Sequence, residues 1–213
     1  MNIIMTGSTS FVGAATVREL LRRGHTVTAI VRPKSSKLDT ILEGNEEAVL
    51  SGRLLVTEND LSEPEKLLEK VTKPQDVFCH FGWGGSGSAS RTDKALQEKN
   101  MEISLETVRT AEALGCKKFL FSGSQAEYGM HQDLITEDTV CEPKSLYGEA
   151  KLAMREKGEK LCDELGLRYI HARIFSAYGP GDHPWTLVES CLDTFLSNKE
   201  MSMGACTQKW NFL

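Results

Sequence analysis

Three stretches of the sequence follow the same order: a helical pattern, a glycine, and then a run of β-branched or aromatic residues. The glycines are Gly24, Gly115 and Gly166, and each fits the left-handed position just past a helix end, where the absence of Cβ removes a steric cost. A repeated order of helix, glycine and strand is typical of parallel βα units. The order therefore predicts an α/β fold with a doubly wound parallel sheet.

The expected strands are mostly continuous apolar runs, which is typical of strands that helices cover on both faces. With right-handed crossovers, the ligand crevice of such a sheet lies at the carboxyl ends of its strands. We expect strands at Asn2–Thr6, Thr26–Val31, Arg53–Val56, Asp76–Phe81, Lys118–Ser122 and Arg168–Phe175.

Composition is that of an ordinary globular protein, because 213 residues with 40% hydrophobic and 26% charged residues can bury a sizeable core. The net charge of −5 argues against a nucleic-acid partner, which would require a basic face. No apolar run approaches the roughly 20 residues that span a bilayer, and the first strand enters a turn too early for a signal peptide. We therefore expect a cytoplasmic protein without a membrane partner.

Cysteine and histidine spacing predicts no metal site. The six cysteines include no CxxC pair, so reduced and mostly buried thiols are expected, and the five histidines lack HxxxH or HExxH spacing. His80 and His171 lie in strand-like apolar runs, where we expect packed, hydrogen-bonded imidazoles.

The first strand runs directly into TGSTSFVG, from Thr6 to Gly13. Gly7 permits a tight turn, and Gly13 permits close packing of the following helix, whose free N–H groups would face an anion. Ser10 stands where a third glycine would be expected; it fits if φ stays negative, and its hydroxyl could donate to a pyrophosphate. Alone, the stretch is equally compatible with a turn that binds nothing.

The end of the second strand lacks the acidic residue that bonds an adenosine ribose in dinucleotide folds. Instead, Arg32 is followed by Lys34, Ser35 and Ser36, a cationic and hydroxyl-rich set that suits a 2′-phosphate. NADP(H) is therefore favoured as the cofactor, with NAD(H) as the alternative. If the segment binds no ligand, it is a solvated basic loop.

Hydroxyl and amine groups follow later in the chain. Tyr147 and Lys151 are four residues apart on one helix face, where the ammonium would lower the pKa of the phenol, although such pairs are also common on helix surfaces. Ser122 or Ser124 could present a hydroxyl at the carboxyl edge of the sheet, where it would hold a substrate oxygen. The alternative for the serines is a polar turn.

Together these motifs resemble the extended short-chain dehydrogenase/reductase family, in its nucleotide-sugar epimerase, dehydratase and reductase branch. The resemblance covers essentially the whole chain through TGSTSFVG, Asp60-Leu61, DVFCHFG, Asn100, FSGSQAEYG, YGEAK and ARIFSAYGPG. It implies an NAD(P)-binding Rossmann domain over residues 1–175. Residues 176–213 would begin a smaller substrate-binding region, which is expected to be truncated at CTQKWNFL.

The resemblance also implies residue roles, with Ser124 as the catalytic hydroxyl, Tyr147 as the general acid/base, and Lys151 as the residue that lowers the pKa of this tyrosine. Substrate-binding positions would be Trp83, Arg91, Ser124 and Ser176. With Arg32 added, the cofactor-binding positions would be Gly7, Ser10, Phe11, Val12, Gly13, Arg32, Asp60, Leu61, Phe81, Gly82, Asn100, Tyr147, Lys151 and Phe175.

Departures from the family pattern narrow the reaction. A 4,6-dehydratase carries an acidic residue two positions after the catalytic hydroxyl, where this chain has Ala126, and Glu127 is expected to face the other way. This leaves hydride transfer at C4 of a nucleotide sugar, by a 4-keto-reductase or a 4-epimerase, and Arg32 favours the reductase. A non-catalytic NADP(H)-binding sensor or scaffold is the alternative, although all three triad residues are present.

Two further expectations concern mobile and oligomeric features. The loop from Trp83 to Arg91 is rich in glycine and would either cover the substrate, with Arg91 meeting a diphosphate, or remain a flexible surface loop. The helices near 93–114 and 145–165 would, by resemblance, pair with their copies in a homodimer.

Overall fold

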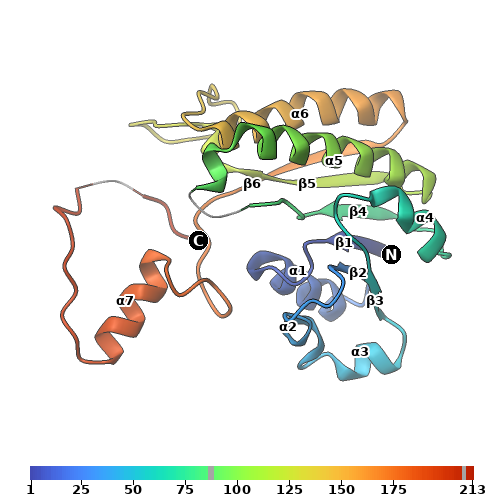
Figure 1. The fold of residues 1–213 in the computed structure, drawn as a ribbon, viewed down its shortest axis with the longest axis horizontal. Helices are drawn as coiled ribbons and strands as arrows, with labels where there is room; N and C mark the ends of the chain where they lie inside the picture. The colour runs from blue at the N-terminus through green and yellow to red at the C-terminus, as the bar shows by residue number, and fades with distance from the viewer. Residues whose placement is uncertain (86–88, 208–209) are drawn as a thin grey trace.

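In a computed structural model, which describes residues 1–85, 89–207 and 210–213, six parallel strands form a sheet in the order β3-β2-β1-β4-β5-β6 (Figure 1). The predicted doubly wound parallel sheet is confirmed. The strands are β1 (Asn2–Thr6), β2 (Thr26–Val31), β3 (Leu54–Glu58), β4 (Val77–His80), β5 (Lys118–Ser124) and β6 (Arg168–Ile174).

Strand bounds agree with the sequence for β1 and β2 and differ by one or two residues elsewhere. β3 continues to Glu58 because its last residue pairs with Val31 of β2, and β5 continues to Ser124 because this residue pairs with Ile174 of β6. Pairing with a neighbour thus keeps each backbone extended past the point where its apolar run ends. The extension of β5 places Ser124 at the carboxyl edge of the sheet.

Helices cover both faces of the sheet (Figure 1). One face carries α1 (Phe11–Arg22), α2 (Asp39–Leu42) and α3 (Glu46–Leu50), and the other carries α4 (Leu67–Lys70), α5 (Lys94–Ala113) and α6 (Leu146–Glu164). Short 3-10 turns are η1 (Pro64–Lys66), η2 (Ser90–Thr92) and η3 (Gln125–Glu127). None of the described helices is long and apolar enough to cross a membrane.

The glycines that end the repeated helices have the expected conformation. Gly24, Gly115 and Gly166 have φ values of +80°, +83° and +70°, so each reverses the chain from a helix into the next strand. The six cysteines, all in the described part of the chain, are unpaired, as expected.

His80, the last residue of β4, is completely buried and hydrogen-bonded on both ring nitrogens, as the sequence predicted. Nδ1 lies 2.9 Å from Thr6 Oγ1 and Nε2 lies 3.1 Å from Ser104 Oγ, so the ring ties β1 and β4 to α5. Burial, and secondarily the charge of Lys151, lowers the pKa of His80 to about 3. The folded protein therefore keeps this imidazole neutral.

We expect the free energy of unfolding to fall as the pH drops below 6.5. The unfolded chain then binds a proton that folded His80 does not bind until about pH 3, so stability present above 6.5 is lost on acidification. The slope from this group approaches about 1.4 kcal/mol per pH unit. Urea unfolding between pH 6.5 and pH 4 should show a smaller dependence of this free energy on pH in His80→Asn than in the unaltered protein. Equal slopes in the two proteins would contradict the assignment.

Beyond β6 the chain leaves the sheet. α7 (Leu187–Leu196) stands apart from the sheet, and the C-terminus returns to the carboxyl end of β6 (Figure 1). There Phe212 forms an isolated parallel bridge with Ser176, and the N–H of Tyr178 donates to the carbonyl of Leu213. The final stretch CTQKWNFL thus contributes a single bridge, and residues 208–209 of that stretch lie outside the described part.

Candidate cofactor and catalytic site

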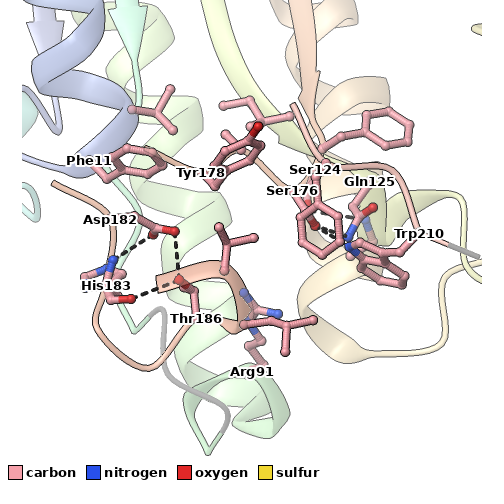
Figure 2. A pocket seen from close by; sticks show the side chains of 18 of the residues that line it. Phe11, Arg91, Ser124, Gln125, Ser176, Tyr178, Asp182, His183, Thr186 and Trp210 are labelled. Atoms are coloured by element: carbon pink, nitrogen blue, oxygen red, sulfur yellow. Dashed lines mark hydrogen bonds between the residues drawn. The ribbon is translucent and has the colours of Figure 1, made fainter. Parts of the chain in front are cut away.

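A cleft of about 1150 Å³ opens at the carboxyl ends of the central strands. One end of the cleft is lined by Ser124, Gln125, Ser176 and Trp210 (Figure 2). Another side is formed by a hydrogen-bonded turn that contains Asp182, His183 and Thr186. The predicted positions that line the cleft are Ser10, Phe11, Val12, Phe81, Trp83, Arg91, Ser124, Tyr147, Lys151, Phe175 and Ser176. The fold therefore brings together residues that are spread over most of the sequence.

The turn after β1 depends on its two glycines. Gly7 has φ +69°, and a Cβ there would lie 2.7 Å from the carbonyl carbon of Phe81, at the end of β4. A Cβ on Gly13 would overlap the carbonyl oxygen of Gly7. Both close approaches are backbone contacts, so neither can be relieved by moving a side chain, and the tight turn requires glycine at both positions.

Ser10 fits the turn in the way the sequence required but uses its hydroxyl differently. Its φ is −76°, and its side chain caps α1 by accepting a hydrogen bond from the N–H of Gly13 at 3.1 Å. The hydroxyl proton is donated to the carbonyl of Gly7 at 2.7 Å. In this structure the single hydroxyl proton is directed within the turn, and the expected donation to a pyrophosphate stays a prediction.

Two substitutions of Ser10 separate capping from ligand contact. Ser10→Ala should lower the free energy of unfolding by about 1 kcal/mol, and Ser10→Gly by only a few tenths, because glycine is tolerated at an N-cap. Since the hydroxyl proton stays within the turn, Ser10→Gly should leave NAD(P)H affinity intact, measured by nucleotide fluorescence. A collapse of binding in Ser10→Gly would show that the ligand needs the hydroxyl.

Several of the predicted cofactor-binding positions lie around the ends of β3 and β4 and in the neighbouring helix α5. Leu61 packs against Gly82, where a Cβ would lie 2.6 Å from a methyl carbon of the leucine. Asn100 is buried in α5, and its amide is bonded at both ends to Gly84: Oδ1 accepts from the N–H at 2.9 Å and Nδ2 donates to the carbonyl at 2.8 Å. Asn100 thus holds the loop after β4 rather than pointing its amide at a ligand.

Arg32 is exposed at the end of β2, as the cofactor prediction requires. The structure also brings a carboxylate there: Glu58, the last residue of β3, accepts a long hydrogen bond of 3.4 Å from the N–H of Lys34. Asp60 is close enough for Arg32 to help lower its pKa, although hydrogen bonds from Ser62 contribute more. The absence of an acidic residue from the strand-two segment is therefore offset by a neighbouring strand, which the sequence reading missed.

Ser124, Tyr147 and Lys151 meet on one wall of the cleft. Ser124 ends β5, and the other two residues lie in the first turns of α6. The Nζ of Lys151 donates to the carbonyl of Ser122 at 2.8 Å and lies 5.7 Å from the centroid of the Tyr147 ring. The bond to the main chain of β5 therefore holds the Lys151 ammonium beside the phenol ring of Tyr147.

The protonation of this pair differs from the sequence expectation. Burial raises the pKa of Tyr147, and the Ser124 side chain and the charge of Arg91 act in the opposite direction. Burial also lowers the pKa of Lys151 to about 7. The positive charge that acts to lower the pKa of Tyr147 is that of Arg91 rather than that of Lys151, and burial outweighs it.

Trp83 and Arg91 complete the surroundings of the tyrosine–lysine pair. The Nζ of Lys151 lies 3.9 Å from the centroid of the Trp83 ring, and the Cζ of Arg91 lies 4.9 Å from the centroid of the Tyr147 ring. Trp83 is anchored through its indole N–H, which donates to Gln97 at 3.0 Å. Residues 86–88 of the predicted covering loop lie outside the described part of the chain.

The sequence model of one family matches almost the whole chain. Residues 3–213 fit the family described as NAD dependent epimerase/dehydratase. The chain belongs to this family. The resemblance drawn from the motifs is thus confirmed at the level of the family.

Relatives of this chain within the family include enzymes that act on sugars and sugar acids. It is 29% identical over 178 residues to D-erythronate dehydrogenase of Cupriavidus necator, covering 82% of this chain and 53% of that protein. It is 28% identical over 185 residues to a UDP-glucose 4-epimerase of Lactobacillus helveticus, covering 84% of this chain and 52% of that one. The chain therefore spans about half the length of these curated relatives.

The fold agrees with a solved structure of the same kind. UDP-glucose 4-epimerase of Thermotoga maritima, solved with UDP-glucose, superposes with a TM-score of 0.84 at 23% identity, covering 100% of this chain and 69% of that one. At this identity the likeness concerns the fold. Within the described residues, no group of three or more His, Cys, Asp or Glu side chains is placed to hold a metal ion.

The residues of the turn after β1 fit a dinucleotide. The first N–H groups of α1 have no intrahelical carbonyl, so the helix start at Phe11 and Val12 presents donors to the cleft. Gly7 and Gly13 let this helix start approach the end of β4 closely. The turn that was ambiguous in the sequence therefore has the geometry of an anion cradle.

Glu127 does not face the cleft, but the reason differs from the one expected. It lies in η3 rather than on a strand, and its carboxylate points at His171 and Arg173 of β6. It does not line the cleft, so it is not placed to supply the acidic group of a 4,6-dehydratase.

Two glycines in the wall of the cleft that holds Ser124, Tyr147 and Lys151 received no role from the sequence. A Cβ on Gly148 would overlap the carbonyl oxygen of Ala126, so glycine next to Tyr147 lets α6 approach η3. A Cβ on Gly123 would overlap His171 Nε2, so glycine next to Ser124 leaves room for the side chains behind it. The signal was available in YGEAK and FSGSQ, where each glycine adjoins a predicted catalytic residue.

Proposed function

We propose that this chain carries the hydride-transfer site of an NAD(P)-dependent enzyme acting at C4 of a nucleotide-diphosphate sugar, as a 4-keto-reductase or a 4-epimerase. The observation that carries the proposal is the convergence of Ser124, Tyr147 and Lys151 on one wall of the cleft that begins at the first turn of α1. These three groups can hold a sugar oxygen and move its proton.

The roles follow from where each group lies. The Ser124 hydroxyl would hold the sugar oxygen at C4, and Tyr147 would give that oxygen its proton or remove it. Lys151, buried beside the phenol, would supply positive charge to the same place. The nicotinamide would exchange a hydride with the sugar carbon, and Phe175 and Phe81 would line its pocket.

A matrix of cofactors and sugar nucleotides tests the proposal directly. Thermal unfolding would be measured with NAD(H) or NADP(H), each with UDP-, dTDP-, GDP- and CDP-sugars, because ligands that bind the folded state raise the unfolding midpoint. A shift with one sugar nucleotide together with turnover supports the enzyme. Cofactor binding without turnover on any sugar nucleotide would instead favour the second candidate, a non-catalytic NADP(H)-binding sensor or scaffold.

The choice of cofactor rests on the end of β2. Arg32 supports NADP(H), because a guanidinium suits a 2′-phosphate, whereas Glu58 on the adjacent strand would favour the free ribose of NAD(H). We propose NADP(H) and expect Arg32→Ser to weaken NADP(H) binding more than NAD(H) binding. Glu58→Gln is the matched test of the carboxylate, and a clear NAD(H) preference of the unaltered protein would overturn the assignment.

Release of the cofactor separates the two reactions. A reductase consumes NADPH with a 4-keto sugar, whereas an epimerase returns its hydride and shows no net change in NADPH absorbance. Arg32 supports the reductase, because a guanidinium suits the 2′-phosphate of NADPH, which a reductase consumes. Net oxidation of NADPH during turnover would support the reductase. Interconversion of UDP-glucose and UDP-galactose without net oxidation would favour the epimerase.

Three further proposals concern the whole protein. Residues 1–175 would bind the cofactor and residues 176–213 would begin the substrate region.

A homodimer would form through α5 and α6, which lie side by side on the outside of the sheet (Figure 1). Light scattering tests the dimer, and a monomer at all concentrations would contradict it. The cytoplasmic location stays a prediction.

A further inference from the structure

A cluster of ionisable side chains lies directly behind Ser124, outside the lining of the cleft. Glu127 has no exposed surface, and the side chains of His171 and Arg173 are 8% and 10% exposed. The Nε2 atom of His171 lies 2.9 Å from both carboxylate oxygens of Glu127, and Nε of Arg173 donates to Oε2 at 2.8 Å. A buried carboxylate is thus held between two basic side chains of β6.

The same carboxylate holds the residue that carries the proposed catalytic hydroxyl. The main-chain N–H of Ser124 donates to Oε1 of Glu127 at 2.7 Å, and Oγ of Ser124 accepts a bond from the N–H of Ala126 at 3.2 Å. Together these two bonds form a capping box at the start of η3. Gly123 provides the space, because a Cβ there would lie 2.7 Å from Oε1 of Glu127.

The charge of the cluster reaches the cleft wall. Burial alone would raise the pKa of Glu127, but the bonds from His171 and Arg173 outweigh burial and lower it, so the carboxylate is ionised. Its negative charge raises the pKa of Lys151, which acts against the lowering by burial, and it also raises the pKa of Tyr147. Glu127 and Lys151 are both bonded to the main chain of β5 two residues apart, at the N–H of Ser124 and the carbonyl of Ser122. The titratable and charged groups that face this carboxylate are therefore His171, Arg173 and Tyr169 from β6, and Tyr147 and Lys151 from α6.

We propose that Glu127 is a positioning residue of this site: its carboxylate fixes the main chain of Ser124 against β6 and supplies negative charge to the pocket that holds the Lys151 ammonium. The proposal rests on the proposed function, because that function gives Ser124 and Lys151 their roles. Glu127 does not line the cleft, so in this proposal it acts through the serine and the lysine.

Two substitutions separate the charge of Glu127 from its reach. Glu127→Gln keeps the size and an acceptor oxygen but removes the charge, whereas Glu127→Asp keeps the charge but shortens the reach to the N–H of Ser124. Glu149→Gln, at an exposed position of α6, is the matched control. The Lys151 ammonium would be titrated by NMR with isotope-labelled lysine, and its signal assigned with Lys151→Arg.

In folded Glu127→Gln, the midpoint of the Lys151 titration should move to lower pH, because a nearby negative charge is lost. In Glu127→Asp and Glu149→Gln the midpoint should stay near that of the unaltered protein. With NADPH and a 4-keto nucleotide sugar, kcat should fall by up to about 10²-fold in Glu127→Asp with little change in KM, since the misplaced serine would act on the chemical step. An unchanged Lys151 titration in folded Glu127→Gln would overturn the proposal.

A measurement on the unaltered protein decides the matter if either variant fails to fold. A main-chain N–H that donates to a carboxylate at short distance resonates downfield, so the amide proton of Ser124 should lie downfield of the other β5 amides. An ordinary position for this amide would overturn the proposal. The titration and this signal need no substrate, so they remain decisive even if no sugar nucleotide is turned over and the proposed function fails.

Discussion

Tyr147→Phe should lower kcat for the proposed C4 reaction by about 10²–10⁴-fold, the usual contribution of a positioned general acid or base. In the proposed reaction the phenol oxygen moves the proton of the sugar oxygen, and phenylalanine keeps the ring that packs against Trp83 and Arg91. NADPH oxidation with a 4-keto sugar, or interconversion of 4-epimers, measures the loss. The unfolding midpoint with and without NADP(H) shows whether the cofactor site survives.

Tyr178→Phe provides the comparison. Tyr178 also lines the cleft, but from the segment after β6, and half of its surface is exposed. The same chemical change should cost far less there, because this phenol is not paired with a buried ammonium. Equal losses in the two variants, or full activity in Tyr147→Phe, would remove Tyr147 from the proposed role.

Gly7→Ala should remove NAD(P)H binding and destabilise the fold. A Cβ at φ +69° costs about 1–2 kcal/mol, and its approach to the main chain of Phe81 and Gly82 adds about 1–3 kcal/mol of overpacking. The turn and the end of β4 must then separate, which moves the start of α1 away from the cleft. Urea unfolding measures the first effect and nucleotide fluorescence the second.

Gly24→Ala is the matched control for this prediction. Gly24 has a similar φ of +80°, but a Cβ there would meet nothing within 4 Å. Only the conformational cost of about 1–2 kcal/mol should appear, with NAD(P)H affinity unchanged. If the two variants lost the same stability and both bound the cofactor, the close approach of Gly7 to β4 would have no role in the site.

Local patterns in the sequence were sufficient to predict most of the fold. Gly24, Gly115 and Gly166 mark the helix ends because positive φ is a property of single residues, and the apolar runs mark the strands because burial on both faces leaves no alternation. The bounds of β5 were missed because its last two residues, Gly123 and Ser124, are extended only through pairing with β6.

The residues of the site could also be named from the sequence, but not the bonds between them. Ser10 and Asn100 carry polar groups that the sequence reading assigned to the cofactor, whereas Glu127 was expected only to face away from the site. In the structure they bond to Gly7, to Gly84 and to Ser124, respectively. Such hydrogen bonds form only after the packing of the fold has brought each side chain within bonding distance of its partner.

The sequence by itself determined the parallel βα order, the glycine turn after β1 and the set of hydroxyl and amine groups at the strand ends, because each depends on local conformation or on residue type. Tertiary structure decided how these groups are charged and held. Lys151 owes its lowered pKa to burial, and Ser124 is bonded to a carboxylate supported by β6. Desolvation and contacts between distant segments exist only in the folded chain, so no local pattern could have predicted them.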